Sequence, residues 1–311
     1  MKQVLITGGA GFIGSHTADV LLAQGCAVRV FDNFSNGKYA NLDAGALSDG
    51  RLTLVDGDIR DSQSVDAAVV DVDAVLHMAA QVSVPRSVAD PVESSTHNVV
   101  GFLNVLDAVR RYKVRRMVYA SSAAVYGIPE TLPLTESNTA MPLSPYGLEK
   151  FINDRYAALY LELYGVSSVG MRYFNVFGPR QDPKSPYAGV ISKFADGLEG
   201  AKPLHVFGDG LQTRDFIYVG DVARANALAL QADVTGVLNV GTGSSVTLLA
   251  LIDAMKEAFD KPAVVCHEPP AIGDIAHSAT NPARLQQTLG WQSNTSFVQG
   301  LRALAESLRD T

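Results

Sequence analysis

Short apolar runs alternate with segments of helical periodicity throughout the first half of the chain. The predicted strands are residues 4–6, 28–31, 52–55, 74–76 and 117–119, and the helical segments between them are 12–24, 64–70 and 91–112. Strands that are apolar along their whole length are buried on both faces, as in a parallel sheet covered by helices. The pattern therefore predicts repeated βαβ units and an α/β fold with a Rossmann-type, doubly wound parallel sheet.

The length of the chain leaves room for a second, smaller domain. The 311 residues, of which 47% are hydrophobic and 18% charged, are typical of a folded globular protein longer than one average domain. From about residue 166 the regular alternation gives way to turn-rich stretches. We predict a Rossmann domain over residues 1–171 and a smaller α/β substrate-binding domain over 172–311, with strands from 215–242 free to return to the first sheet.

Charge and cysteine content exclude several classes of function. A net charge of −7 argues against binding of nucleic acid, which requires a basic surface. Cys26 and Cys266 are too isolated to indicate a metal site or a disulfide framework, and no metal is expected. No apolar run is long enough for a membrane span or a signal segment. We therefore expect a cytoplasmic protein with neither a membrane nor a nucleic-acid partner.

Three glycines follow the first predicted strand at intervals of three residues. Gly8, Gly11 and Gly14 lie where the first helix begins. Glycine allows a tight turn and close approach of the backbone to a pyrophosphate, and the start of a helix offers free N–H groups. An ordinary glycine-rich turn is the alternative, but an acid at the end of the second strand argues against it. Asp32 stands where a carboxylate accepts hydrogen bonds from the adenosine ribose and repels a 2′-phosphate, so NAD is favoured over NADP.

A tyrosine and a lysine four residues apart are the candidate catalytic pair. Tyr146 and Lys150 share one face of a helix if Phe151, Ile152 and Tyr156 form its buried side. A free phenol has a pKa of about 10, so it becomes a useful base only when a nearby positive charge favours the phenolate. The alternative is an amphipathic helix with a solvated lysine. The position of two serines argues against this alternative. Ser121 and Ser122 follow the fifth strand at the carboxyl edge of the sheet, where ligands bind.

These motifs together resemble the extended short-chain dehydrogenases, and most closely the bacterial UDP-N-acetylglucosamine 4-epimerases. The resemblance covers essentially the whole chain and includes residues 172–175, 213–219 and 239–241. It implies NAD as the cofactor, a UDP-sugar as the substrate, a homodimer built from residues 91–112 and 146–164, and a role in polysaccharide synthesis. It implies that Tyr146 is the acid and base, that Lys150 lowers the pKa of this phenol and binds the nicotinamide ribose, and that Ser122 or Ser121 shares the bond to the sugar hydroxyl.

The resemblance also implies two sets of binding residues. The cofactor would contact Gly8, Gly11, Phe12, Ile13, Gly14, Asp32, Asn33, Asp58, Ile59, Ala79, Ala80, Gln81, Tyr146, Lys150, Tyr173 and Phe174. The substrate would contact Ser83, Ser122, Asn175, Ala188, Val190, Val206, Arg214 and Ser278.

Two features narrow the reaction and the sugar. Sugar 4,6-dehydratases of this family carry an acid pair after the strand-end hydroxyl, whereas this chain has Ala123 and Ala124, so epimerisation at C4 is favoured. The small Ser278 stands where a large side chain restricts relatives to sugars without an N-acetyl group, which favours UDP-GlcNAc and UDP-GalNAc. UDP-glucose 4-epimerase and a non-catalytic NAD-binding protein are the alternatives.

The chain departs from the family at Ala271, where a diphosphate-binding arginine is usual. Arg214 is then the best candidate for the nucleotide phosphates. The alternative for Arg214 is a surface salt bridge with Asp215.

Overall fold

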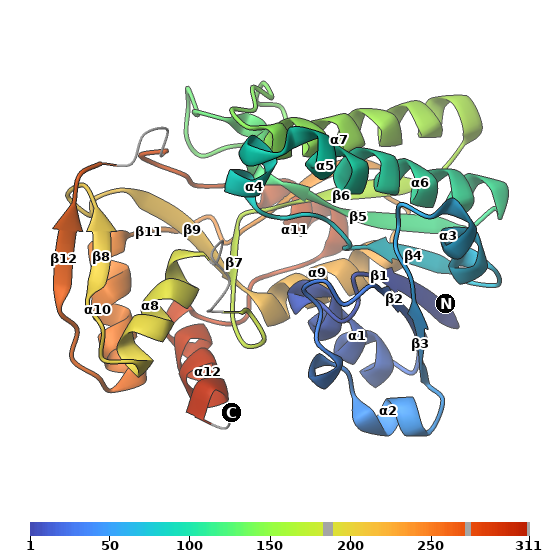
Figure 1. Ribbon diagram of the computed structural model, residues 1–311. Coiled ribbons are helices and arrows are strands. Elements are labelled where there is room, and N and C mark those ends of the chain that lie inside the picture. The colour runs from blue at the N-terminus through green and yellow to red at the C-terminus, as the bar shows by residue number, and fades with distance from the viewer. Residues whose placement is uncertain (183–188, 271–274, 310–311) are drawn as a thin grey trace.

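The computed structural model describes residues 1–182, 189–270 and 275–309, and a seven-stranded parallel sheet runs through its centre (Figure 1). The strand order is β10-β6-β5-β4-β1-β2-β3. The strands are β1 (Gln3–Thr7), β2 (Ala27–Asp32), β3 (Leu52–Asp56), β4 (Ala74–His77), β5 (Arg116–Ser122), β6 (Ser168–Tyr173) and β10 (Gly236–Val240). All five strands predicted in the first half are present, and the predicted Rossmann-type α/β class is confirmed.

Helices cover both faces of this sheet. On one face lie α1 (Phe12–Ala23), α2 (Ala44–Ser48), α9 (Val219–Gln231) and α11 (Ala283–Leu289), and on the other lie α3 (Ser62–Val69), α6 (Phe102–Arg111) and α7 (Pro145–Tyr164). Two short 3₁₀ turns, Tyr39–Asn41 and Ala123–Tyr126, follow β2 and β5. No helix in the described parts of the chain has the length and apolar character that a membrane crossing requires.

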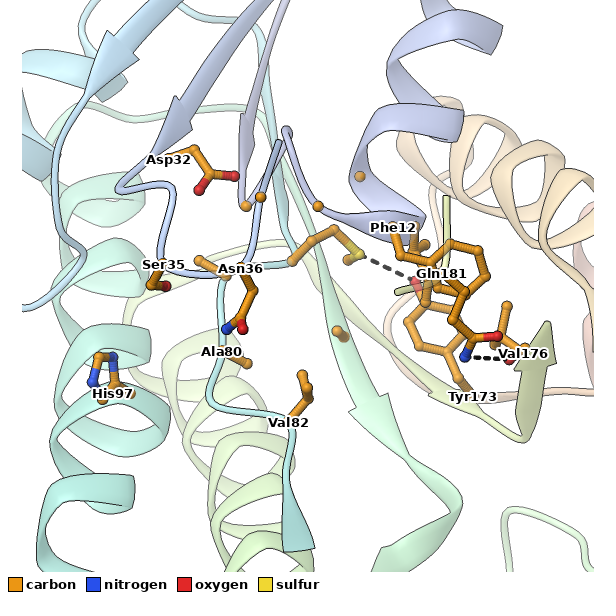
Figure 2. Close-up of a pocket in the computed structure, with 18 of the residues that line it drawn as sticks. Phe12, Asp32, Ser35, Asn36, Ala80, Val82, His97, Tyr173, Val176 and Gln181 are labelled. Atoms are coloured by element: carbon orange, nitrogen blue, oxygen red, sulfur yellow. Dashed lines mark hydrogen bonds between the residues drawn. The ribbon is translucent and has the colours of Figure 1, made fainter. Parts of the chain in front are cut away.

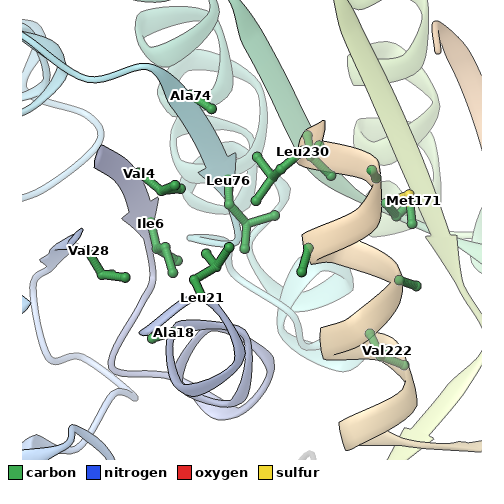
Figure 3. Packing of buried hydrophobic residues seen from close by; sticks show 14 of the residues in the cluster. Val4, Ile6, Ala18, Leu21, Val28, Ala74, Leu76, Met171, Val222 and Leu230 are labelled. Atoms are coloured by element: carbon green, nitrogen blue, oxygen red, sulfur yellow. The ribbon is translucent and has the colours of Figure 1, made fainter. Parts of the chain in front are cut away.

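Burial on both faces explains the continuous apolar runs. In β1, Val4 and Ile6 pack towards α1 and α9, whereas Leu5 packs into the cluster on the opposite face. Figure 3 shows Val4, Ile6 and Leu76 meeting Leu21 of α1 and Leu230 of α9. Because successive side chains of a strand point to opposite faces, a strand covered on both sides needs an apolar residue at every position.

The predicted helical segment 91–112 is present, with a change of pitch in its middle. α4 (Val84–Ala89) precedes it, and the segment itself comprises α5 (Pro91–Ser95), a π-helical turn (Thr96–Gly101) and α6. Pro91 occupies the first turn, where its missing N–H costs nothing, and the Asp90 side chain caps the helix by accepting from the Glu93 N–H at 3.0 Å.

Helix α7 buries a polar face, contrary to the predicted one. Phe151 and Ile152 are only half-buried and Tyr156 is 36% exposed, so the prediction that these residues form the buried side was wrong. The buried residues are Gly147, Glu149, Lys150, Asn153, Asp154 and Ala157. The neighbouring strands supply polar partners, since Asp154 accepts from Arg172 Nε at 3.0 Å and from the Tyr119 hydroxyl at 3.1 Å. These partners make burial of the polar face possible.

A second unit is formed by the later part of the chain. It contains a three-stranded sheet of β7 (Asn175–Phe177), β9 (Thr213–Tyr218) and β11 (Ser245–Thr247), and a parallel pair of β8 (Leu204–Phe207) and β12 (Val265–Glu268). α8 (Val190–Glu199), α10 (Leu248–Phe259) and α12 (Phe297–Arg309) pack on them around a separate apolar cluster. Within 215–242, β10 and α9 belong with the large sheet while β9 does not, and the domain boundary at residue 171 stays a prediction.

We predict that Trp291→Ala destabilises the protein strongly. Trp291 is 2% exposed in the cluster beneath α9, and its indole N–H donates to the Asp221 carbonyl at 3.0 Å. Loss of the ring leaves a cavity and removes one hydrogen bond to this carbonyl, so the free energy of unfolding should fall by about 3–5 kcal/mol, measured by urea denaturation. Tyr39→Ala removes an aromatic side chain that is 61% exposed and should have little effect. Equal stabilities of the two variants would contradict the prediction.

Candidate active site

One cleft runs along the carboxyl ends of β1, β2, β4 and β5. Its volume is about 480 Å³, and it extends from the glycine turn and Asp32, past Ala79 and Ala80, to Tyr146. Figure 2 shows Asp32, Ser35 and Asn36 on one side of it and Phe12, Tyr173 and Gln181 on another. The carboxyl edge of a doubly wound sheet is where such folds bind their ligands.

The glycine turn at one end of the cleft requires glycine at two positions. Gly8 has a φ of +68°, and a Cβ on it would lie 2.6 Å from the backbone nitrogen of Ala79. A Cβ on Gly14 would lie 2.3 Å from the carbonyl oxygen of Gly8. Gly11 caps α1 without any side-chain hydrogen bond, so no side chain competes for the first N–H groups of the helix. Backbone N–H groups at a helix start are suited to a phosphate.

Asp32 organises the loop that follows β2. Its side chain is buried and accepts hydrogen bonds from the Ala10 and Phe34 N–H groups, both at 2.9 Å. Burial raises the pKa of this carboxyl, and the two hydrogen bonds oppose the increase. The loop contributes cleft residues that the sequence analysis missed, namely Ser35, Asn36, Gly37, Lys38 and Asn41. The Asn36-Gly37 pair, four residues after the end of β2, indicates a turn but does not show that the loop folds back onto the cleft.

The predicted catalytic residues meet at the other end of the cleft. Lys150 is 2% exposed, so the alternative of a solvated lysine is excluded. Its Nζ donates to the Ala120 carbonyl at 3.1 Å and lies 5.8 Å from the centre of the Tyr146 ring. Both serines line the cleft, and the Ser122 hydroxyl lowers the pKa of the Tyr146 phenol, which favours Ser122 over Ser121.

Burial perturbs the pKa values of both members of the pair. It raises the pKa of the Tyr146 phenol, while the hydrogen bond with Ser122 lowers it. It also lowers the pKa of Lys150 to about 8, against the opposing charges of Glu149 and Asp154. A buried phenol and ammonium in one cleft, each shifted towards neutral charge, have the character of an acid–base site.

Most of the predicted cofactor residues line this cleft. They are Gly8, Gly11, Phe12, Ile13, Gly14, Asp32, Asn33, Ile59, Ala79, Ala80, Tyr146, Lys150, Tyr173 and Phe174. Asp58 and Gln81 do not. Asp58 pairs with Arg60 at 2.7 Å and accepts from Asn33 Nδ2 at 3.0 Å, and the bond from Arg60 holds the pKa of Asp58 well below its usual range. The Gln81 side chain is buried and donates to Ser94 Oγ at 3.1 Å.

The predicted substrate residues are more scattered. Ser122 lines the cleft, whereas Ser83 is buried and caps α4 through the Arg86 N–H. Asn175 Nδ2 donates to the Asp215 carbonyl at 3.0 Å. The Val206 side chain is 1% exposed within the core of the second unit, and Val190 is the first residue of α8.

The remaining substrate predictions lie around β9. Arg214 Nη1 donates to the Thr213 carbonyl at 2.9 Å. The backbone N–H of Ser278 donates to the same Thr213 carbonyl. Asp215 is fully buried and accepts hydrogen bonds from Thr242 and Gly243. Its carboxylate is therefore not at the surface, where the alternative interpretation of Arg214 placed a salt bridge between the two residues. Ala188 and Ala271 lie outside the described residues.

Further cleft residues come from loops, from the π-helical turn and from β7. Val82, His97, Val176, Arg180, Gln181, Asp182 and Gly189 also line it. His77 lies nearby but bonds to Thr7 Oγ1 at 2.8 Å, and burial lowers its pKa to about 3, so it stays neutral as a packed residue. Ala123 and Ala124 lie in the short turn after β5 and supply no acid or base.

The arrangement fits a dinucleotide. A single cleft joins a buried carboxylate, a glycine turn that a Cβ would obstruct, and a tyrosine–lysine pair. These are the groups needed by a ribose, a pyrophosphate and a nicotinamide ribose, respectively. Asp32, Gly11 and Lys150 would therefore hold the three parts of NAD.

Comparisons with known proteins agree with this geometry. The model of the NAD dependent epimerase/dehydratase family matches residues 4–241. A putative UDP-glucose 4-epimerase of Methanocaldococcus jannaschii is 39% identical over 312 residues, covering 99% of each chain. A UDP-glucose 4-epimerase of Mycolicibacterium smegmatis is 36% identical over 311 residues, again covering 99% of each.

Solved structures are equally similar. A UDP-N-acetylglucosamine 4-epimerase from Methanobrevibacter ruminantium, in complex with UDP-N-acetylmuramic acid, superposes with a TM-score of 0.95 at 36% identity, covering 99% of this chain and 98% of that one. A UDP-glucose 4-epimerase of Thermus thermophilus in complex with NAD gives a TM-score of 0.91 at 39% identity, covering 99% of both. The chain therefore belongs to the NAD-dependent epimerase/dehydratase family, within the extended short-chain dehydrogenases that its motifs resemble.

Proposed function

We propose that this protein is an NAD-dependent epimerase that inverts C4 of a UDP-hexose, and that UDP-GlcNAc and UDP-GalNAc are its preferred pair. The observation that carries the proposal is the meeting of Ser122, Tyr146 and Lys150 in the cleft that begins at the glycine turn. The names of similar proteins support the reaction, since they include both UDP-glucose and UDP-N-acetylglucosamine 4-epimerases.

In this proposal Tyr146 removes the proton from the C4 hydroxyl and later returns it to the opposite face. Ser122 shares the hydrogen bond of the reacting hydroxyl, and the Lys150 ammonium stabilises the negative charge that the phenol acquires. NAD, when bound, supplies the reversible exchange of a hydride with C4. The sugar passes through a 4-keto state and must turn over within the site. Because Ala123 and Ala124 offer no proton shuttle, elimination of water from this state has no catalyst.

We predict that Tyr146→Phe lowers kcat by about 10²–10⁴-fold, because the variant loses the group that moves the proton. The anomeric proton signals of UDP-GlcNAc and UDP-GalNAc, followed by NMR, measure the turnover. Tyr156→Phe, on the exposed side of the same helix, is the matched control and should keep full activity. Undiminished turnover by Tyr146→Phe would contradict the mechanism, and a wild-type protein that binds NAD without turnover would favour the non-catalytic alternative.

The preference for an N-acetylated sugar rests on a small residue. Ser278 is half-buried next to β9, and in our proposal its small side chain makes room for an acetamide that a large side chain would exclude. We place Asn175, Val190 and Arg214 around the nucleotide, with Arg214 compensating for the arginine missing at Ala271, whereas burial of Val206 in the core argues against a contact with the nucleotide. UDP-glucose and UDP-galactose are the second candidate pair, supported by the names of several relatives.

We predict that Ser278→Tyr reduces kcat/KM for UDP-GlcNAc by about 10²-fold and changes the value for UDP-glucose little, because the ring occupies the space of the acetamide. Kinetics with both sugars measure the change. Ser244→Tyr, on an exposed turn of the same unit, is the control. An unchanged ratio between the two sugars in Ser278→Tyr would remove this residue from the specificity argument.

We further propose a cytoplasmic homodimer that serves polysaccharide synthesis. The exposed side of α7 carries three leucines, with Leu148 at 49%, Leu159 at 44% and Leu163 at 63% exposure, and Val92 of α5 is 75% exposed. An apolar stripe of this kind on neighbouring helices is typical of a surface that pairs with a second copy.

We predict that Leu159→Glu combined with Leu163→Glu converts a dimer into a monomer, because a dimer would bury these charges. Size-exclusion chromatography with light scattering gives the mass. Val264→Glu, at a residue 66% exposed in the second unit, should leave the dimer intact. A monomeric wild-type protein would refute the assembly.

A further inference from the structure

Helix α7 carries a buried carboxylate that the proposed proton transfer does not use. Glu149 is 2% exposed and lies between Tyr146 and Lys150 in the sequence. Among the described residues, no lysine, arginine or histidine forms an ion pair with it within 4.0 Å. Burial of an unpaired carboxylate is costly unless hydrogen bonds replace its hydration. Three neutral groups do so here, since Asn98 Nδ2 donates at 2.6 Å, Ser94 Oγ at 2.9 Å and Ser95 Oγ at 3.2 Å.

The same hydrogen bonds connect Glu149 to the wall of the cleft. Asn98 holds the backbone of Gln81 from both sides, accepting its N–H at 2.9 Å and donating to its carbonyl at 2.8 Å. Gln81 lies between Ala80 and Val82, which line the cleft. The carboxylate, Asn98 and the 80–82 segment are therefore one hydrogen-bonded unit, and a change at Glu149 reaches the cleft along it.

Glu149 also acts on the candidate catalytic pair through its charge. Its negative charge raises the pKa of Lys150 against the larger effect of burial, and it raises the pKa of Tyr146. Lys150 is the member of the pair that loses its charge most easily, because burial lowers its pKa to about 8.

The other titratable groups around α7 are paired or neutral. Glu93 bonds to His97 and Arg86, Asp154 to Arg172 and Tyr119, Tyr126 to Asn239, and Asp107 to Arg110, while burial keeps His77 uncharged. Asp154 also raises the pKa of Lys150, so Glu149 and Asp154 together hold the ammonium in its charged form.

We propose that Glu149 is a positioning residue that places a buried negative charge next to the Tyr146–Lys150 pair and ties the 80–82 wall of the cleft to the helix that carries Tyr146. The kinetic part of this inference rests on the proposed epimerase function. The structural and electrostatic parts do not, because they concern only the NAD-loaded protein.

The kinetic test is the pH dependence of kcat for Glu149→Gln. Removal of the negative charge lowers the pKa of Tyr146 and of Lys150, so both limbs of the profile should move to lower pH by about one unit. A residue that only supported the fold would lower kcat at every pH without moving the limbs. Glu162→Gln, on the exposed side of the same helix, is the matched control and should leave the profile in place. Unmoved limbs in Glu149→Gln would overturn the proposal.

A second measurement needs no substrate. NMR titration of ¹³Cζ-tyrosine in the NAD-loaded protein follows the phenol, with Tyr146→Phe assigning its signal. The Tyr146 titration should move to lower pH in Glu149→Gln and return towards the wild-type value in Glu149→Asp, which keeps the charge. If Glu149→Gln does not fold, Glu149→Ser removes the charge with a smaller side chain and should show the same shift. An unmoved Tyr146 titration overturns the proposal even if the protein proves to be an epimerase, whereas a shifted titration without turnover counts only against the epimerase function.

Discussion

The candidate site depends on the burial of a polar helix face against the end of a sheet. α7 presents Lys150 and Asp154 to β5 and β6, where the Ala120 carbonyl accepts from Lys150 and the Arg172 and Tyr119 side chains donate to Asp154. The Asp154–Arg172 pair is nearly inaccessible, with side-chain exposures of 5% and 6%. Because an unpartnered charge in such a position would be strongly unfavourable, the helix has essentially one rotation about its axis in which these groups are satisfied. That rotation is the one that directs Tyr146 and Lys150 into the cleft.

The strands and the glycine turn could be predicted because their causes are local. A strand covered on both faces needs apolar residues throughout, and the turn before α1 needs glycine at positions 8 and 14 for steric reasons. Both requirements are visible in the sequence without any knowledge of distant contacts. The same holds for the spacing of Tyr146 and Lys150.

The buried face of α7 could not be predicted in this way. The hydrophobic pattern predicted that Phe151, Ile152 and Tyr156 form the buried side of the helix. The polar face is buried instead, because β5, β6 and the π-helical turn supply its hydrogen-bond partners. The side of the cleft formed by Lys38 and Asn41 was missed for a similar reason, since the loop is held in place by the buried Asp32 carboxylate and by bonds to Ala10. Pairings between distant segments decide both features, and no local pattern records them.

The route of the chain between the two units has a consequence for how the protein can be divided. After β9 the chain re-enters the large sheet as α9 and β10, where β10 pairs with β6 along its whole length. A fragment that ended before this return would leave β6 as an open edge with unpaired backbone groups and would uncover Ile6, Leu76 and Met171 beneath the missing α9. Such a fragment would tend to self-associate, so we expect the two units to fold as one piece.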